Sequence, residues 1–303
     1  MAEQRDQLIR HDRWMAKALY GPQGYYTSKK TVLGARGDFS TTPKLSSTLA
    51  WTLAERVAAS GLRDIIELGP GDGTLATDLF QNLSWWRKKR TRYHFVEISP
   101  RLQELQRARF PAKKAFWHAE LSDALRATSG TAFILSNEFF DAFPVRVFRD
   151  QTELFLRDGS EEVWKPTNDQ CRPISSAFSH QWPGHQRLEV AESIQEWCQS
   201  QLQSFHKGEM ISVDYGGSAK EIYHRRPEGS IRAYWHHQRQ IAPEIYDYPG
   251  QKDLTFDVNF EDLRTWTEAA GLTTAAYQTQ AKFCDDLPGG PSDHFQVLHQ
   301  SRG

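Results

Sequence analysis

The chain has 303 residues, of which 39% are hydrophobic and 25% are charged, and its 37 basic and 38 acidic residues leave a net charge of −1. This length fits one elaborated domain or two domains, and the composition is that of a globular protein, which excludes intrinsic disorder, collagen and a coiled coil. The near-neutral balance also disfavours a nucleic-acid partner bound through a globally basic surface.

The sequence predicts a protein without a membrane span or a metal. No run approaches the ~18 apolar residues that a span requires, and the first residues, MAEQRDQLIRHDRW, lack the apolar core of a secretion signal. Cys171, Cys198 and Cys284 lie far apart with no histidine at ligand spacing, so we expect neither a disulfide framework nor a zinc site. These features favour a cytoplasmic location. They do not indicate an oligomeric state.

The N-terminal part predicts two helices on either side of an irregular segment. Leu8, Met15, Ala18 and Leu19 are spaced as on one helix face, which predicts a helix within the first ~20 residues. Glycines interrupt residues 21–43, which indicates a loop. A second helix is predicted over 43–60, with proline in its first turn.

From residue 64 the predicted elements alternate. We expect strands at 64–68, 93–98, 115–119 and 131–136, and helices at 74–83, 101–110 and 121–127. Strands that alternate with helices of this length form right-handed βαβ units and a parallel sheet. The predicted fold class is therefore α/β, with a doubly wound sheet.

This alternation stops after Pro144. Residues 145–166 predict antiparallel strands, 187–205 an amphipathic helix, 209–216 a fifth core strand, 260–270 a helix, and 272–278 and 294–299 two final strands. We therefore predict an N-terminal cap (1–60), a core (61–144 and 207–303) and an α+β insertion (145–206) that shapes a substrate groove.

The most informative motif is IIELGPGDGTL, residues 65–75. A strand that contains Glu67 runs into a loop with glycines at three alternate positions, followed at once by a helix; the glycines are Gly69, Gly71 and Gly73. Such a loop lets the backbone approach a ligand beyond the carboxyl end of a strand. A dinucleotide prefers GxGxxG, whereas this loop reads GxGxG and contains Asp72, an acid that would oppose a pyrophosphate.

Glu67 and Asp72 suit a cationic ligand without phosphate better than a dinucleotide, and S-adenosylmethionine is such a ligand. Glu97 falls at the end of the second strand, where a carboxylate can accept hydrogen bonds from both ribose hydroxyls. The alternative is a glycine turn with surface acids and no ligand.

A second constellation, SNEFFDAFPV, follows the fourth strand. Asn137, Glu138 and Asp141 should face the same crevice, because the fourth strand lies beside the first at the switch point. The two carboxylates can share a face if a helical turn follows the strand and ends before Pro144. A carboxylate pair suits a guanidinium nucleophile, whose planar fork matches carboxylates. The alternative is a capping or packing role for each acid.

With these motifs the sequence resembles the MidA-like methyltransferase family, whose mitochondrial members assist assembly of respiratory complex I by methylating a protein arginine. The similar segments are MAKALYGPQGYY, GDFSTTP, ELGPGDGTL, VEISPRLQELQ, NEFFDAFPV, VDYG, GSIRAYWHH and PGQKDLTFDVNF, in family order over most of the chain.

The resemblance implies a class I methyltransferase fold, Rossmann-like, with extra helices and strands that shape a substrate groove. It implies a cofactor site made of Glu67, Gly69, Gly71, Gly73, Glu97 and Asn137, with Glu120 and Leu121 near the adenine. It also implies that the GDFSTTP loop, with Gly37, Asp38 and Thr41, closes over the cofactor.

Three further features leave their roles open. The segment WWRKKRTR, residues 85–92, falls in a connection after the first core helix, so we expect a solvated loop. The alternative is that its stacking groups and basic residues touch RNA or an acidic partner. His236 and His237 could line a groove, and no third ligand at metal spacing accompanies them. Asp253 could cap a turn or bind substrate.

The sequence-based hypothesis is methyl transfer from S-adenosylmethionine to a protein side chain, namely an arginine guanidinium nitrogen. Glu138 and Asp141 would orient the guanidinium and, with Asp38, steer its departing proton. By the resemblance, the partner is a protein substrate such as a respiratory-complex subunit. The alternatives are a methyltransferase of a small molecule or another polymer, and a non-catalytic assembly factor that binds the cofactor.

Overall fold

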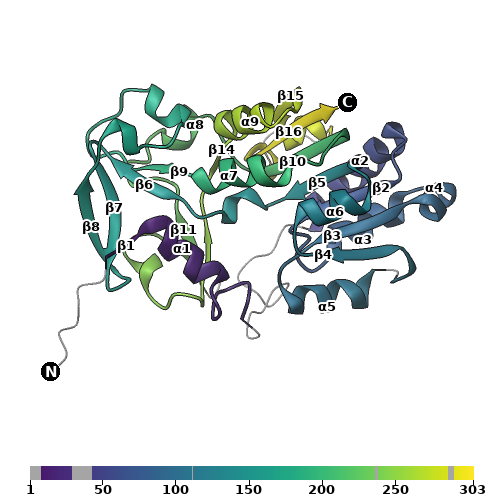
Figure 1. Cartoon of the computed structure of the whole chain (residues 1–303), viewed down its shortest axis with the longest axis horizontal. Coiled ribbons are helices and arrows are strands. Elements are labelled where there is room, and N and C mark those ends of the chain that lie inside the picture. The colour runs from purple at the N-terminus through teal and green to yellow at the C-terminus, as the bar shows by residue number, and fades with distance from the viewer. Residues whose placement is uncertain (1–7, 29–42, 111, 236–237, 286–289) are drawn as a thin grey trace.

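The computed structural model describes residues 8–28, 43–110, 112–235, 238–285 and 290–303. Within them the largest sheet has eight strands and forms the middle of the molecule (Figure 1). Across this sheet the order is β15 (Thr273–Thr279), β16 (Phe295–Arg302), β10 (Lys207–Gly217), β5 (Thr131–Asn137), β2 (Asp64–Leu68), β3 (Arg92–Val96) and β4 (Ala115–His118), and β14 (Val258–Asn259) pairs with β10.

The direction of the chain across this sheet reverses between β2 and β5. Strands β2, β3 and β4 follow one another toward one edge, whereas β5 and β10 lie on the other side of β2, and all these pairs are parallel. Only β16 runs antiparallel to β10 within the pairs described. The carboxyl ends of β2 and β5 therefore lie side by side at the switch point, where ligands bind in open α/β sheets.

Helices cover both faces of the sheet because its inner strands are apolar on both sides. Ile65 belongs to one core and Ile66 to the other, and both are completely buried. The core that contains Ile66 includes side chains of α6 (Leu121–Ala127), α7 (Glu192–Gln201) and α9 (Phe260–Ala269). The other includes side chains of α2 (Pro43–Ser60), α3 (Thr74–Asn82) and α10 (Gln280–Phe283). The remaining helices of the sheet region are α4 (Trp85–Arg90) and α5 (Pro100–Arg109).

A second sheet lies at the opposite end of the long axis from α4 (Figure 1). It contains β1 (Leu8–Arg10), β7 (Thr152–Arg157), β6 (Arg146–Arg149) and β9 (Leu188–Val190), with β8 (Glu161–Pro166) paired to β7. A third sheet contains β12 (Gln238–Gln240), β11 (Arg232–Trp235) and β13 (Asp253–Thr255). Two more α-helices, α1 (His11–Tyr20) and α8 (Ala219–Tyr223), accompany these sheets. The 3₁₀ turns are η1 (Ala112–Lys114), η2 (Phe140–Ala142), η3 (Asp169–Cys171), η4 (Ser176–Ser179), η5 (Glu244–Tyr246) and η6 (Pro291–Asp293).

Three predicted elements were wrong in type or extent. The segment 8–10, expected in a helix, is strand β1, because it pairs with β7. The helix expected over 187–205 begins only at Glu192, because Leu188 and Val190 belong to β9, which pairs with β6. The WWRKKR segment, expected as a solvated loop, is helix α4, which Ser84 caps by accepting a hydrogen bond from the Arg87 amide. Local periodicity could not reveal these strand pairings, because the partners are distant in sequence.

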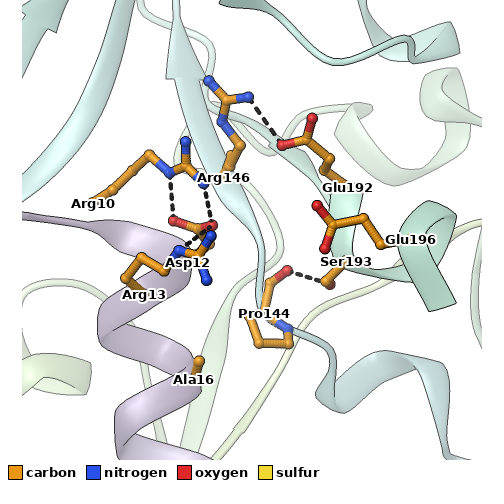
Figure 2. Close-up of a pocket in the computed structure, with 9 residues that line it drawn as sticks. All are labelled: Arg10, Asp12, Arg13, Ala16, Pro144, Arg146, Glu192, Ser193 and Glu196. Carbon is orange, nitrogen blue, oxygen red and sulfur yellow. Dashed lines mark hydrogen bonds and ion pairs between the residues drawn. The ribbon is translucent and has the colours of Figure 1, made fainter.

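Charged side chains of the N-terminal segment, β6 and α7 line a small cleft of about 80 Å³ (Figure 2). The buried Arg146 guanidinium makes a two-pronged contact with Glu153, at 2.8 and 3.0 Å, and contacts Glu192 at 3.0 Å. Arg10 binds Asp12 through two hydrogen bonds of 2.7 Å. These charges compensate one another, so the cleft is a structural junction, and it contains none of the site residues predicted from the sequence.

The division into a cap, a core and an insertion stays a prediction. No helix in the described part of the chain is long and apolar enough to cross a membrane. The three cysteines, Cys171, Cys198 and Cys284, are free thiols.

Candidate active site

The glycine loop joins β2 to α3 at the switch point. Gly69, Gly71 and Gly73 all have positive φ, at 58°, 54° and 80°, a conformation that favours glycine. A Cβ on Gly69 would lie 2.8 Å from the Phe139 ring, whereas a Cβ on Gly71 would meet nothing within 4 Å. The loop therefore packs tightly against the segment after β5 at Gly69 and leaves open space at Gly71.

Both carboxylate oxygens of Asp72, in this loop, already have partners within the protein. Its Oδ1 accepts hydrogen bonds from the Thr74 amide at 3.0 Å and the Thr74 hydroxyl at 2.7 Å, and its Oδ2 lies 2.7 Å from Arg109. Burial opposes ionisation, but these hydrogen bonds outweigh it and lower the pKa of Asp72. Asp72 thus acts as a cap for α3, and its charge is balanced by Arg109. The acid that we expected to attract a cationic ligand from inside the loop serves the fold.

Glu97 lies directly after β3, beside the glycine loop. Its Oε1 accepts a hydrogen bond from the Ser99 amide at 2.8 Å, and its own amide donates to the His118 carbonyl at 3.0 Å. Burial raises the pKa of Glu97 to about 7. The carboxylate is therefore held in place by backbone groups at the carboxyl end of the sheet.

Gln106, which we did not single out from the sequence, connects the loop to its surroundings. It is completely buried, and its Nε2 donates to the Gly71 carbonyl at 2.7 Å and reaches Glu97 Oε2 at 3.5 Å. Its Oε1 accepts from Trp117 Nε1 at 2.9 Å. A polar residue on the inward face of the helix at 101–110 was the signal that could have identified it.

The other predicted cofactor residues differ in their surroundings. Glu67 is buried within β2 and accepts a 2.5 Å hydrogen bond from the Tyr93 hydroxyl, and burial raises its pKa to about 7. Leu121 is completely buried in the core. Glu120 is exposed at the start of α6, where its Oε2 accepts from Ser122 and Gln201 at 3.4 Å. Of these side chains, only Glu120 is open to solvent.

The segment after β5 forms a tight turn that carries both predicted catalytic acids. Glu138 has φ 53°, an uncommon value for a residue with a side chain, and its amide donates to the Val213 carbonyl at 3.0 Å. Asn137 donates to Glu138 Oε1 at 3.1 Å. The 3₁₀ turn η2 then contains Asp141, whose Oδ2 accepts from the Thr255 hydroxyl at 2.7 Å. The expected helical turn before Pro144 is therefore present.

Asp214 in β10 organises this turn and was also missed. Its side chain is completely buried, and Oδ2 accepts from the amides of Phe139, Phe140 and Asp141 at 3.1, 2.9 and 3.3 Å. Oδ1 accepts from the Tyr215 amide at 2.9 Å. One carboxyl group thus satisfies the backbone donors of the turn. The VDYG segment contained it, but nothing local indicated that it reaches a segment about seventy residues earlier.

The acids around this turn influence one another. Burial and the neighbouring Asp141 raise the pKa of Glu138 to about 8. Burial raises the pKa of Asp141 to about 6, against the lowering effects of Thr255 and Arg232. Burial and the charges of Asp141 and Glu138 raise the pKa of Asp214 well above its ordinary range. The turn is therefore a buried acidic environment that an added cation would stabilise.

Asp253 borders the same acidic environment, since its charge also raises the pKa of Glu138. Its Oδ1 accepts a 2.8 Å hydrogen bond from the Tyr26 hydroxyl. The Tyr26 ring stacks on Tyr20, with centroids 5.6 Å apart, and Tyr20 donates to the Ala142 carbonyl at 2.9 Å. The end of α1 and the segment after it are thus tied to the turn. Gly37, Asp38, Thr41, His236 and His237 lie outside the described residues.

These residues fit S-adenosylmethionine as a cofactor. The loop offers a backbone cradle with open space at Gly71, and the buried Glu97 carboxyl group lies at the neighbouring strand end. Both are suited to a ligand with hydroxyl groups and positive charge and without phosphate, since the basic side chain that meets this loop, Arg109, is paired with Asp72.

The chain is similar in fold to two solved proteins of Burkholderia thailandensis. One, solved as a high-resolution native structure, superposes with a TM-score of 0.76 and 25% identity, covering 97% of this chain and 87% of that one. The other, crystallised bound to S-adenosyl-homocysteine, superposes with a TM-score of 0.78 and 24% identity, covering 97% and 88%. These superpositions confirm the predicted α/β fold class.

Curated relatives are similar over most of this chain. A Drosophila melanogaster protein, named protein arginine methyltransferase NDUFAF7 homolog, mitochondrial, is 28% identical, with 85% of this chain and 66% of the relative covered. The Mus musculus protein arginine methyltransferase NDUFAF7, mitochondrial, is 27% identical, with 94% and 74% covered. The chain spans about two thirds of the length of the first of these relatives.

A family model described as "Putative S-adenosyl-L-methionine-dependent methyltransferase" matches residues 48–278. The matched region contains the glycine loop, Glu97, the turn after β5 and Asp214. The match confirms the resemblance and the cofactor class inferred from the motifs. The chain therefore belongs to this MidA-like family of S-adenosyl-L-methionine-dependent methyltransferases.

Proposed function

We propose that this protein transfers a methyl group from S-adenosylmethionine to a guanidinium nitrogen of a protein arginine. The observation that carries the proposal is the acidic turn of Glu138 and Asp141, which Asp253 of β13 borders and which adjoins the glycine loop through the contact of Phe139 with Gly69. The names of the curated relatives, which describe protein arginine methyltransferases, support the same substrate class.

The proposed cofactor site is formed by the glycine loop with Glu97, and Glu67, Asn137, Glu120 and Leu121 are proposed to border it. The cofactor, when bound, supplies an electrophilic methyl group on a sulfonium. Gln106 holds the Gly71 carbonyl and Trp117 in fixed positions, so the loop is organised before the ligand arrives. This preorganisation reduces the ordering that binding requires.

Glu138 and Asp141 would position the nucleophile and receive its proton. Because free guanidinium has a pKa above ~12, it arrives as a cation and favours the ionised form of both acids. The Thr255 hydrogen bond fixes Asp141, and Asn137 fixes one oxygen of Glu138. The nitrogen loses its proton as it forms the new bond, and the proton passes to Glu138, whose pKa of about 8 suits a group that exchanges protons near neutral pH. Asp38 is proposed as a helper.

The partner and the location are also part of the proposal. We propose a protein substrate, such as a subunit of a respiratory complex, and a cytoplasmic site of action. The three free cysteines support a reducing compartment, whereas the matched relatives are named as mitochondrial proteins. Subcellular fractionation of the native host with an antibody to this protein tests the location directly, and recovery in an organelle fraction would contradict it.

The activity is tested by incubating the purified protein with a host lysate and S-adenosylmethionine labelled in its methyl group. We expect label in protein, and methylarginine after acid hydrolysis and mass spectrometry. A Glu138→Gln variant that still binds S-adenosylmethionine serves as the control, and label should enter protein roughly 100-fold more slowly with it than with the wild type. Label in low-mass products alone would instead indicate a small-molecule methyltransferase. Cofactor binding without any labelled product would indicate a non-catalytic assembly factor.

A further inference from the structure

Helix α4 presents two adjacent tryptophans to solvent. Trp85 is 57% exposed and Trp86 is 70% exposed, and no residue of α4 is buried. Their rings are set edge to face with centroids 4.5 Å apart. Figure 1 shows α4 at the extreme end of the long axis, away from the second sheet. Exposing two large aromatic rings at one tip of the molecule is costly in water, and such patches mark interaction sites.

The same helix is strongly basic, and its charge has no acidic counterpart. Arg87, Lys88, Lys89 and Arg90 follow the tryptophans directly, and Lys113 and Lys114 of η1 lie beside them, since Lys114 donates to the Lys89 carbonyl at 2.6 Å. Within the part of the chain that the structure describes, none of these six side chains forms an ion pair. Like Lys114, two more of them donate to backbone carbonyls: Lys88 to Gln81 at 2.7 Å, and Arg87 to Val57.

We propose that this surface, formed by residues 85–90 and 113–114 and called here the α4 surface, docks the protein on an anionic lipid bilayer. Tryptophan is enriched where apolar and polar layers of a membrane meet, because its ring is large and apolar and its N–H is polar. Clusters of four to eight basic residues are attracted to anionic headgroups. The α4 surface combines both properties, and no acid of the described residues forms an ion pair with it.

Single-stranded nucleic acid is a weaker fit to the α4 surface. Bases stack on free aromatic faces along a groove that follows the phosphate backbone. Here the Lys89 ammonium covers the Trp85 ring at 3.7 Å from its centroid, and Trp86 stands at 76° to it. A helix at the tip of the molecule suits contact with a flat surface better.

Docking through α4 would leave the candidate active site accessible. Helix α4 leads into the amino end of β3, which is parallel to β2, whereas the glycine loop leaves the carboxyl end of β2. The two features therefore lie at opposite ends of the parallel strands, separated by the length of a five-residue strand. Membrane docking and methyl transfer should consequently be separable by mutation.

The test is cosedimentation of the full chain with vesicles of phosphatidylcholine alone and of phosphatidylcholine with phosphatidylserine. We expect the protein to bind only the anionic vesicles, and added salt to weaken this binding. A Lys89→Gln/Arg90→Gln variant should bind roughly 25-fold more weakly, and Trp86→Ala roughly tenfold more weakly. The matched controls are Lys165→Gln/Lys220→Gln, which removes two exposed lysines elsewhere, and Trp51→Ala, which removes a tryptophan that is 54% exposed.

The controls should bind as the wild type does, and all variants should retain affinity for S-adenosyl-homocysteine, which shows that they are folded. Equal weakening in the controls would contradict a specific surface. Absence of wild-type binding to anionic vesicles would overturn the proposal. Tighter binding to a single-stranded RNA homopolymer, lost in the same two α4 variants, would reassign the surface to nucleic acid.

Discussion

Glu138 combines two features that are rare in one residue. It holds a left-handed backbone conformation, with φ 53°, and its carboxyl group has a pKa raised to about 8 by burial and by Asp141. Backbone strain of this kind persists where the surrounding structure enforces it, and here the Val213 carbonyl and Asn137 hold the residue. At pH 7 most of the free protein therefore carries a protonated Glu138, which a bound guanidinium would ionise.

Replacement of Glu138 by glutamine tests this role. We expect kcat for the labelled peptide or protein substrate to fall by roughly 100-fold, as for loss of a general base. In the wild type, kcat/KM should rise as pH increases through about 8, because the ionised carboxylate binds the cation, and the variant should lack this rise. Initial rates measured from about pH 6 to about pH 9.5, the range in which such a group titrates, give both the fall in kcat and the pH dependence of kcat/KM. Wild-type turnover in the variant would remove Glu138 from the mechanism.

Variants of two glycines in the same loop distinguish a packing role from a role in ligand binding. Gly69→Ala places a Cβ 2.8 Å from the Phe139 ring, whereas Gly71→Ala meets open space at a similar positive φ. Both variants should lose about 1 kcal/mol of unfolding free energy from backbone strain, and Gly69→Ala should lose more through its clash. Gly71→Ala should lose affinity for S-adenosylmethionine without any loss of stability beyond this backbone strain. Urea unfolding and calorimetry measure the two effects, and unchanged affinity in Gly71→Ala would contradict the proposed cradle.

Among the elements, the turn η2 depends on strand β10. Three consecutive amides, those of Phe139, Phe140 and Asp141, converge on one Asp214 oxygen. Asp214 serves this turn as a hydrogen-bond acceptor, and an asparagine at the same position would retain one accepting oxygen. Asp214 is therefore a positioning residue for the acids of the turn.

The Asp214→Ala and Asp214→Asn pair tests this inference. The alanine variant leaves buried amides without an acceptor and should lose about 1–3 kcal/mol of stability per unsatisfied group. It should also lose kcat with little change in cofactor affinity, since Glu138 and Asp141 are displaced while the glycine loop remains. The asparagine variant should recover most of both losses. Equal defects in the two variants would indicate that a charge, and not an acceptor, is required.

The ion pairs of Arg146 with Glu153 and with Glu192 connect β6 to β7 and to α7. Arg146→Met should destabilise the protein by about 3–5 kcal/mol, because it leaves the buried Glu153 without its partner. The double variant Arg146→Met/Glu153→Leu should be much closer to the wild type in stability, since neither buried charge remains. Urea unfolding of the two variants decides this, and a double variant as unstable as the single one would contradict it.

Across the molecule, several carboxyl groups are buried where burial raises the pKa more than neighbouring hydrogen-bond donors and cations lower it. The pKa is raised to about 7 for Glu67, Glu97 and Glu189, to about 8 for Glu138 and to about 6 for Asp141. In the unfolded chain these groups titrate near ~4. Between these values the native state binds more protons than the unfolded state, so stability falls as pH rises.

We therefore expect the Tm of the ligand-free protein to decrease steadily from about pH 5 to about pH 8, the window between the unfolded and native pKa values. Glu138→Gln should show a shallower decrease, because one of these groups no longer titrates. Differential scanning calorimetry across this range provides the measurement. A Tm that stayed constant or increased would show that the buried acids are compensated in the native state.

The parts of the molecule that were predictable from sequence are those that depend on local order. The segment 64–75 is apolar, then glycine-rich, then helical in its spacing, and this pattern indicated β2, the loop and α3. The antiparallel strands after Pro144 were indicated in the same way. Leu188–Val190 was misassigned because its apolar alternation is compatible with a helix face until pairing with β6 is known.

The site was predictable where its chemistry follows a strand and not where distant segments meet. Neighbouring residues specify the family, the α/β class, the glycine loop and the position of Glu97, Glu138 and Asp141 after their strands, so these features were predictable from the chain alone. The pairing of Asp72 with Arg109, the contact of Gln106 with the loop and the contact of Asp214 with the turn became visible in the folded chain. The physical reason is that a buried polar group takes whatever partner the packed chain brings to it, and that partner can be about seventy residues away.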